Sequence, residues 1–284
     1  MSSTQFAPPL GAIADNVRAA LREDVGAGDL TAQLVPGDRQ GQAKVMCREA
    51  AVLCGRPWFD AVFRSVDSAV VLDWKVDEGA RVAANTVLVD IAGPARALLT
   101  AERSALNFLQ LLSAVATRTR EFVDAVAGTR ARIVDTRKTI PGLRLAQKYA
   151  VRVGGGLNHR IGLHDGILIK ENHISSGGGV REVLRRSQAL AGRAEFVMIE
   201  VETLEQLRTA LDAGATMILL DNMTPATIRE AVAITAGRAQ LEVSGGVTLQ
   251  TVRGLAETGV DRISIGALTK DIKAIDLSMR LQEV

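Results

Sequence analysis

Short apolar runs alternate with stretches of helical spacing between residues 131 and 270. Continuous apolar runs that alternate with helices indicate parallel strands that are buried on both faces. The stretch 207–221 also echoes the stretch 252–266, two such units later. We therefore predict a (β/α) barrel, incomplete or open, in this part of the chain. The six runs are ARIVDTRKT, GILIKENH, FVMIEVET, MILLDNMT, QLEVSGGVT and RISIGALTK, which begin at residues 131, 166, 196, 217, 240 and 262.

The earlier part of the chain has a different pattern. Apolar positions at residues 13–25 have helical spacing, and Gly26 ends this predicted helix. Val-rich runs separated by Gly, Asp and Asn fill residues 40–92 and predict a small β-rich region. An apolar stripe over residues 98–128 predicts one long helix or two consecutive helices.

Together these patterns predict an α/β protein with two domains. We expect residues 1–111 to form a sandwich-like α+β domain and residues 112–270 to form the open barrel, which would be the catalytic domain. The C-terminal residues 271–284 are expected to pack back on the first domain. A chain of 284 residues is long enough to bury two cores of this size.

Charged residues end several of the predicted strands. In a barrel the carboxyl ends of the strands surround one cavity, so these residues are expected to converge there. They are Arg137, Lys138, Lys170, Glu200 and Asp221. Arg137 and Lys138 are neighbours, and adjacent residues of a strand point to opposite faces. Only one of the two therefore points fully inward, unless the chain already turns at this position.

The predicted cavity combines two opposed chemistries. Arginine and lysine hold carboxylate and phosphate groups, arginine through bidentate pairs and lysine as a point charge. Glu200 and Asp221 suit Mg²⁺ or a developing positive charge, and a barrel-lining ion pair is the alternative. The turns SGG at 244–246 and SIGA at 264–267 let backbone amides approach a phosphate closely, although tight strand–helix packing would also require glycine there.

Charge and composition narrow the class of ligand. The segment 133–173 holds seven basic residues against three acidic ones, whereas the rest of the chain has 27 Lys and Arg against 29 Asp and Glu. A local positive cluster beside apolar strands indicates a site for an acidic small molecule. A near-neutral remainder with 3% aromatic residues argues against a nucleic-acid surface. No apolar run reaches the ~18 residues that span a membrane.

The same segment holds all three histidines of the chain, and their spacing is not that of a zinc site. His159 lies next to Arg160 and is expected to hydrogen-bond an anionic ligand. Cys47 and Cys54 do not form a CxxC motif, and the N-terminus lacks a secretory pattern. These observations predict a cytoplasmic protein.

The segment DTRKTIPGLRLAQKYAVRVGGGLNHRIGLHDGILIKENHI, residues 135–174, closely resembles the quinolinate phosphoribosyltransferase family. The likeness extends over nearly the whole chain through long motifs in the same order. They are EDVGAGDLT at 23–31, GPARALLTAERSALNFLQLLSAVAT at 93–117, IEVET at 199–203, LLDNM at 219–223, EVSGGV at 242–247 and ISIGALTK at 263–270. Ile140 and Gly246 depart from the family pattern, and neither difference removes a charged group.

The resemblance implies transfer of a phosphoribosyl group from phosphoribosyl pyrophosphate to quinolinate, with decarboxylation. The products would be nicotinate mononucleotide, pyrophosphate and CO₂, in de novo NAD biosynthesis. Mg²⁺ is the implied cofactor, bound by Glu200 and Asp221 directly or through water and phosphoribosyl pyrophosphate. The resemblance also implies a homodimer or a higher oligomer, in which Arg103 reaches the neighbouring site.

The resemblance further implies a role for each site residue. Quinolinate would contact Arg137, His159, Arg160 and Lys170, and phosphoribosyl pyrophosphate would contact Lys138. The residues expected to be catalytic are Lys138, Lys170, Glu200 and Asp221. The other residues expected to bind substrate are Thr136, Ser244, Gly245, Gly246, Ile265, Gly266 and Ala267.

Other functions fit parts of the pattern. A sister phosphoribosyltransferase for nicotinate, or a molybdenum-associated paralogue, would share the phosphate half of the site, but a cation set of this size favours a dicarboxylate. A barrel lyase or aldolase would use Lys170 as a Schiff-base nucleophile, which requires a neutral amine. A purely protein-binding role would give the strand-end residues no reason to converge.

Overall fold

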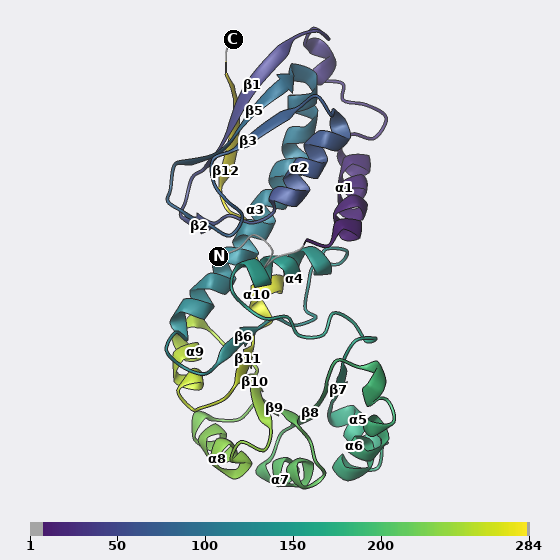
Figure 1. Ribbon diagram of the computed structural model, residues 1–284, viewed down its shortest axis with the longest axis vertical. Coiled ribbons are helices and arrows are strands. Elements are labelled where there is room, and N and C mark those ends of the chain that lie inside the picture. The colour runs from purple at the N-terminus through teal and green to yellow at the C-terminus, as the bar shows by residue number, and fades with distance from the viewer. Residues whose placement is uncertain (1–7, 283–284) are drawn as a thin grey trace. The chain divides into compact units, whose positions relative to one another are not determined.

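The computed structural model describes residues 8–282, which divide into two compact units (Figure 1). The first unit contains the chain up to Arg120, the segment Thr139–Gly155 and the residues from Leu268 onward. The second unit contains Glu121–Lys138 and Gly156–Ala267. No helix among residues 8–282 is both long and apolar enough to cross a membrane.

The first unit is built on an antiparallel sheet of four strands in the order β12–β1–β5–β3. The last strand in the chain, β12, pairs with β1, so the C-terminal segment completes a sheet that the N-terminal region begins. These strands are β1 (Gln40–Cys47), β3 (Val71–Trp74), β5 (Thr86–Pro94) and β12 (Leu277–Gln282), and a separate pair is formed by β2 (Ala51–Val52) and β4 (Arg81–Val82).

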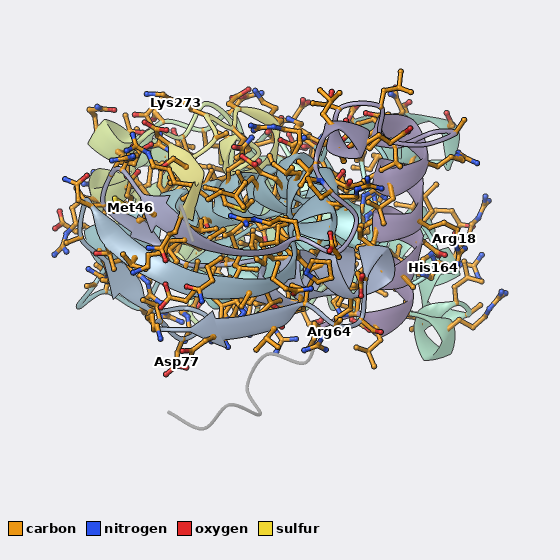
Figure 2. All side chains as sticks on the ribbon, turned by 90° about the horizontal axis from the view of Figure 1, so that it is seen from above. Arg18, Met46, Arg64, Asp77, His164 and Lys273 are labelled. Carbon is orange, nitrogen blue, oxygen red and sulfur yellow. The ribbon has the colours of Figure 1, made fainter. Side chains whose placement is uncertain are left out.

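Helices accompany this sheet on one side (Figure 1). The exposed side chains of Arg18 and Arg64 mark the polar faces of the first two helices (Figure 2). The apolar stripe predicted over 98–128 forms a single helix. The helices are α1 (Leu10–Asp24), α2 (Arg56–Val66), α3 (Ala95–Ala125) and α4 (Arg144–Val153), with a 3₁₀ turn at Ala32–Leu34.

The β-rich region predicted over residues 40–92 also contains a helix, α2, which the sequence pattern did not predict. Trp58, Phe59, Val62 and Phe63 are fully buried and lie on one face of this helix. Aromatic residues also favour strands, and the helix is short and lies between strand-like runs. The segment can therefore be recognised as a helix only from the spacing of its apolar residues over three turns.

The second unit is a parallel sheet of six strands in the order β6–β11–β10–β9–β8–β7, with helices along its outer side (Figure 1). The strands are β6 (Arg132–Val134), β7 (Ile167–Ile169), β8 (Val197–Val201), β9 (Met217–Asp221), β10 (Gln240–Ser244) and β11 (Arg262–Ser264). The helices are α5 (Glu171–Ser176), α6 (Val180–Gln188), α7 (Leu204–Asp212), α8 (Pro225–Thr235) and α9 (Leu249–Ala256), with a 3₁₀ turn at Ala191–Arg193. The short helix α10 (Ala267–Lys270) begins at the last residue of this unit and otherwise belongs to the first.

All six predicted strands are present, and the prediction of an open barrel is confirmed. β6 and β7 form the two edges of the sheet, and no pairing between them closes the barrel within residues 8–282. Threonine is the N-cap of the next helix after three of the strands, namely β8, β9 and β10. Thr203 accepts a hydrogen bond from the backbone of Gln206, and Thr224 accepts one from Thr227. These caps fix the turns at the carboxyl edge of the sheet.

Candidate active site

The carboxyl ends of the parallel strands surround a cavity of about 180 Å³ in the second unit. Cations and carboxylates meet in this cavity, as the positions of the strand ends predict. Eight predicted site residues line it, namely Thr136, Arg137, Lys138, His159, Arg160, Lys170, Glu200 and Ser244. The other lining residues are Leu168, Leu219, Glu242 and Ser264.

Strand alternation explains why these side chains share one cavity. In parallel strands, residues in register point to the same face of the sheet. The register places Leu219 of β9 beside both Glu200 and Glu242, and it places Glu242 beside Arg262 of β11. Two residues later, at the carboxyl edge, Ser244 lies beside Asp221. Charged side chains thus flank an apolar residue in the wall of the cavity.

Arg137 and Lys138 both line the cavity, although they are adjacent in sequence. β6 ends at Val134, so strand alternation no longer applies to these residues. The hydroxyl of Thr136 accepts a hydrogen bond of 3.1 Å from the backbone of Lys138. This hydrogen bond turns the chain at Arg137 and Lys138. From the sequence, both cations were expected to point inward only if the chain turns at this position.

Lys170 and Glu200 form an ion pair across neighbouring strands. Nζ of Lys170 lies 3.3 Å from Oε2 of Glu200. The glutamate side chain is 10% exposed and the lysine side chain 46% exposed, so the lysine is the partner that solvent and ligand reach first. Burial raises the pKa of Glu200, the Lys170 ammonium lowers it, and the charge of Asp221 raises it. The cation therefore helps to keep this carboxylate ionised.

The other side of the cavity carries arginines. Arg160 is buried and donates a hydrogen bond of 3.1 Å to the backbone carbonyl of Gly166. Burial lowers the pKa of Arg160, and the charge of Arg137 lowers it further. Two guanidinium groups that disfavour each other in an enclosed space create a strong preference for an anionic ligand.

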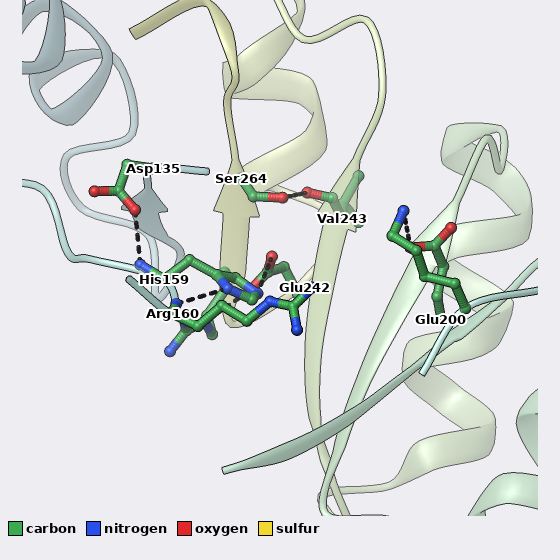
Figure 3. A network of polar contacts seen from close by, with 9 residues as sticks. Asp135, His159, Arg160, Glu200, Glu242, Val243 and Ser264 are labelled. Atoms are coloured by element: carbon green, nitrogen blue, oxygen red, sulfur yellow. Dashed lines mark hydrogen bonds and ion pairs between the residues drawn. The ribbon is translucent and has the colours of Figure 1, made fainter. Parts of the chain in front are cut away.

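His159 is held from several sides (Figure 3). Its backbone N–H donates a hydrogen bond of 2.8 Å to Oδ1 of Asp135, and the side chain of Asn158 donates one of 2.7 Å to Oδ2. Its Nδ1 accepts a hydrogen bond of 2.8 Å from the backbone N–H of Arg160. The fully buried Asp135 therefore fixes the loop that carries both His159 and Arg160.

Two glycines shape the turns at the carboxyl edge, Gly245 through its positive φ and Gly266 through its close approach to Lys138. Gly245 has a φ of 101°, and a Cβ atom at this position would lie 2.9 Å from Oδ1 of Asn222. A Cβ atom on Gly266 would lie 3.0 Å from Cδ of Lys138 and 3.6 Å from the Thr136 hydroxyl. Because glycine carries no side chain, these turns leave the edge of the cavity accessible to a ligand.

The remaining predicted site residues are not among those that line the cavity in the described part of the chain. Asp221 ends β9, accepts a hydrogen bond from Asn222 and acts electrostatically on Glu200. Ile265 is buried, and its backbone N–H donates to the carbonyl of Val134. Arg103 is an exposed residue of α3 in the first unit. The others are Gly245, Gly246, Gly266 and Ala267.

Comparison with known proteins decides the family. Residues 115–280 match the model of the quinolinate phosphoribosyl transferase C-terminal domain, and residues 29–113 match the model of the N-terminal domain. The chain belongs to the quinolinate phosphoribosyltransferase family. The junction between the two matches lies within α3.

Relatives of the chain within the quinolinate phosphoribosyltransferase family match it nearly end to end. A nicotinate-nucleotide pyrophosphorylase [carboxylating] from Mycobacterium leprae is 43% identical over 94% of this chain and 96% of its own length. Quinolinate phosphoribosyltransferase [decarboxylating] 2b, mitochondrial, from Nicotiana tabacum is 39% identical over 93% of this chain and 81% of its own. The structure of the nicotinate-nucleotide pyrophosphorylase from Francisella tularensis has a TM-score of 0.94 and 42% identity, covering 99% of this chain and 100% of that one.

Two carboxylates at this cavity were not singled out from the sequence, namely Glu242, which lines it, and Asp135, which holds the loop of His159. Both lie within motifs that carry the family resemblance, but Asp135 lies two residues before the more conspicuous cations Arg137 and Lys138. A signal was present for Glu242, because it is a charged residue in the middle of the buried strand QLEVS. It also lies two positions before Ser244, on the same face of the strand.

Proposed function

We propose that this protein transfers the phosphoribosyl group of phosphoribosyl pyrophosphate to quinolinate and releases CO₂, which gives nicotinate mononucleotide and pyrophosphate for NAD biosynthesis. The observation that carries the proposal is the cavity itself, in which Arg137, Lys138, Arg160 and Lys170 surround a space suited to a small anion. Family membership and the names of the relatives support the same reaction.

Quinolinate carries two adjacent carboxylates on a pyridine ring. In the proposed complex Arg137 and Arg160 pair with these carboxylates, because guanidinium groups form bidentate hydrogen bonds to them. The apolar side chains of Leu168 and Leu219 provide the surface for the ring. Lys170 supplies a third cation, which becomes available when it turns from Glu200 toward the substrate.

Phosphoribosyl pyrophosphate is proposed to occupy the carboxyl edge of the sheet. Lys138 contacts its phosphate groups, and the glycine turns at 244–246 and 264–267 offer backbone amides to the 5′-phosphate. Glu200 and Asp221 face the ribose, where their negative charges stabilise the positive charge that develops at C1. The two substrates thus meet at the Lys170–Glu200 pair.

Mg²⁺ is proposed as the cofactor. Residues 8–282 contain no cluster of three or more His, Cys, Asp or Glu side chains that could hold a metal ion alone. Two carboxylates, Glu200 and Asp221, fit Mg²⁺ when phosphate oxygens and water complete its ligands. When bound, Mg²⁺ neutralises charge on the leaving pyrophosphate.

The proposed reaction is mainly electrostatic. The ring nitrogen of quinolinate forms a bond to C1 of the ribose as the bond from C1 to pyrophosphate breaks, and the departing electron pair goes to pyrophosphate. Lys138 stabilises that charge, while Glu200 and Asp221 stabilise the ribosyl cation. The product pyridinium withdraws electrons, so the bond to the C2 carboxylate breaks, CO₂ leaves and a proton takes its place.

A homodimer and a cytoplasmic location are also part of the proposal. Arg103 is exposed on α3, as a residue that contributes to a partner's site must be.

Cys47 and Cys54 are free and buried, and unpaired thiols fit a reducing compartment.

Lys170→Ala should lower kcat/KM for quinolinate at least ~100-fold, a loss of roughly 2.7 kcal/mol of transition-state stabilisation. The substitution removes one substrate cation and leaves the carboxylate of Glu200 without its partner. Steady-state kinetics with each substrate varied in turn measures the effect. Lys273→Ala is the matched control, because Lys273 is exposed (Figure 2). This variant should have the same kcat/KM for quinolinate as the parent protein. Near-normal kcat/KM for Lys170→Ala would refute the role of Lys170.

Incubation of the protein with quinolinate, phosphoribosyl pyrophosphate and Mg²⁺ should give CO₂ and nicotinate mononucleotide in equal amounts. Removal of Mg²⁺ by a chelator should abolish both products, and added Mg²⁺ should restore them. Labelled CO₂ and chromatography of the nucleotide measure the two yields. Formation of the mononucleotide from nicotinate but not from quinolinate would instead identify a sister enzyme.

Subunits of Arg103→Ala and Lys170→Ala should each be nearly inactive alone and recover activity together. In a mixed dimer one site carries both defects and the other carries neither. Random mixing makes about half of the dimers mixed, so about a quarter of all sites are intact. Co-expression with two affinity tags isolates the mixed dimer for the assay. No recovery in a mixed dimer that has been isolated would show that Arg103 acts within its own subunit or not at all.

A further inference from the structure

Glu242 is a buried carboxylate of the cavity wall that the proposed reaction does not use. It lies in the middle of β10, and its side chain is 1% exposed. Its Oε2 accepts a hydrogen bond of 2.8 Å from Nε of Arg262 on β11. Its Oε1 has no hydrogen-bond partner among residues 8–282 and lies 3.8 Å from Nε2 of His159. A buried oxygen without a partner is unfavourable, so stability alone does not explain Glu242.

The geometry around His159 defines its tautomer (Figure 3). Nδ1 accepts the backbone N–H of Arg160 at 2.8 Å, so a neutral imidazole carries its proton on Nε2. That nitrogen is the one that faces Glu242. The ring also packs edge-on against Phe196, with ring centroids 5.1 Å apart and an angle of 87° between the planes. The imidazole is therefore held between a backbone donor, an aromatic ring and a carboxylate.

The charge of Glu242 suits it to accept this proton in a hydrogen bond. Burial raises the pKa of Glu242, Arg262 opposes this effect, and the nearby charge of Asp135 adds to it. A more basic carboxylate is a stronger hydrogen-bond acceptor. Arg262 holds one oxygen of Glu242 through its hydrogen bond, while the other oxygen, which faces His159, has no hydrogen-bond partner among residues 8–282.

We propose that Glu242 is a positioning residue. Its open oxygen accepts the Nε2 proton of His159 once the 3.8 Å separation shortens to hydrogen-bond distance, and so, together with the backbone of Arg160, fixes the tautomer and the plane of the imidazole. Nδ1 of the same ring accepts a hydrogen bond from the backbone of Arg160. The contacts from Glu242 through His159 to Arg160 therefore set the position of Arg160, a cation that binds the substrate in the proposed complex. A carboxylate behind an imidazole has this effect in other histidine sites. The inference rests on the proposed function, in which Arg160 and His159 meet quinolinate.

Glu242→Gln tests the inference because an amide offers only one oxygen. If that oxygen faces Arg262, the NH₂ group faces Nε2 of His159 and favours the other tautomer, which conflicts with the N–H of Arg160. If the oxygen faces His159 instead, two donors meet at Arg262. Glutamine therefore cannot satisfy both neighbours, although it has the same shape as glutamate.

Glu242→Gln should lower kcat/KM for quinolinate tenfold or more while the KM for phosphoribosyl pyrophosphate changes less than about threefold. A double-mutant cycle with His159→Asn should show that the two losses are not additive, because both variants break the same chain. A purely structural role for Glu242 would lower the midpoint of thermal unfolding but leave the quinolinate kinetics of the folded protein unchanged. That result, or additive losses, would overturn the proposal.

Nuclear magnetic resonance of ¹⁵N-histidine gives a readout that is independent of activity. The chain has three histidines, and His159→Asn assigns the signal of the relevant one. The parent should show His159 with its proton on Nε2, and Glu242→Gln should shift this signal toward the Nδ1 tautomer or a mixture. A parent signal already in the Nδ1 form would overturn the proposal.

Two further variants separate positioning from folding. Glu230→Gln makes the same substitution on the exposed face of α8 and should change neither kinetics nor the histidine signal. If Glu242→Gln does not fold, Glu242→Asp keeps the charge beside Arg262 but retreats from His159, and it should show the same selective loss for quinolinate. The same quinolinate kinetics in Glu242→Asp as in the parent protein would then overturn the proposal.

A parent protein that does not convert quinolinate would refute the proposed function, whereas an active parent with unaffected Glu242 variants would refute only the role of Glu242.

Discussion

The site depends on the cost of removing charge from water at the carboxyl edge of the parallel sheet. Arg160 is buried beside Arg137, and both groups would be unfavourable there without negative charge nearby. Asp165 supplies part of that charge to Arg160, while Glu200 and Glu242 are buried carboxylates that are paired with cations of their own. The positive charge of the arginines is only partly compensated, so the cavity favours an anionic ligand, which would supply the remaining negative charge. Binding energy and folding energy are therefore coupled in the same few side chains.

Strand register is what brings these charges to the right distance. Glu200, Leu219 and Glu242 are in register on three consecutive strands, so two carboxylates are separated by one apolar residue. Each carboxylate has its own cation, Lys170 in one case and Arg262 in the other. The first pair is accessible, because the Lys170 side chain is 46% exposed, and in the proposed reaction it exchanges partners with a substrate, while the second pair is buried. The same sheet thus provides an accessible ion pair and a buried one.

Much of the second unit could be predicted from the sequence, because short continuous apolar runs between helices are typical of buried parallel strands. The six strands and the convergence of Lys170 and Glu200 follow from that pattern alone. The helix α2 could not be recognised, because its aromatic residues also favour strands and its neighbours are strands. Glu242 was missed because it lies in the middle of a strand, whereas the predicted charges lie close to strand ends or in the loop that carries His159 and Arg160. The inward direction of both Arg137 and Lys138 depends on a turn stabilised by Thr136, which is a contact rather than a pattern.

Calorimetric titration of the protein with quinolinate and with nicotinate measures whether the cavity recognises two carboxylates, as we propose. Nicotinate has the same ring with one carboxylate fewer, so it leaves one cation without its partner. Quinolinate should bind at least tenfold more tightly, a difference of about 1.4 kcal/mol or more, and this difference should decrease as the salt concentration rises. Equal affinity for the two compounds would show that the cavity does not recognise the second carboxylate.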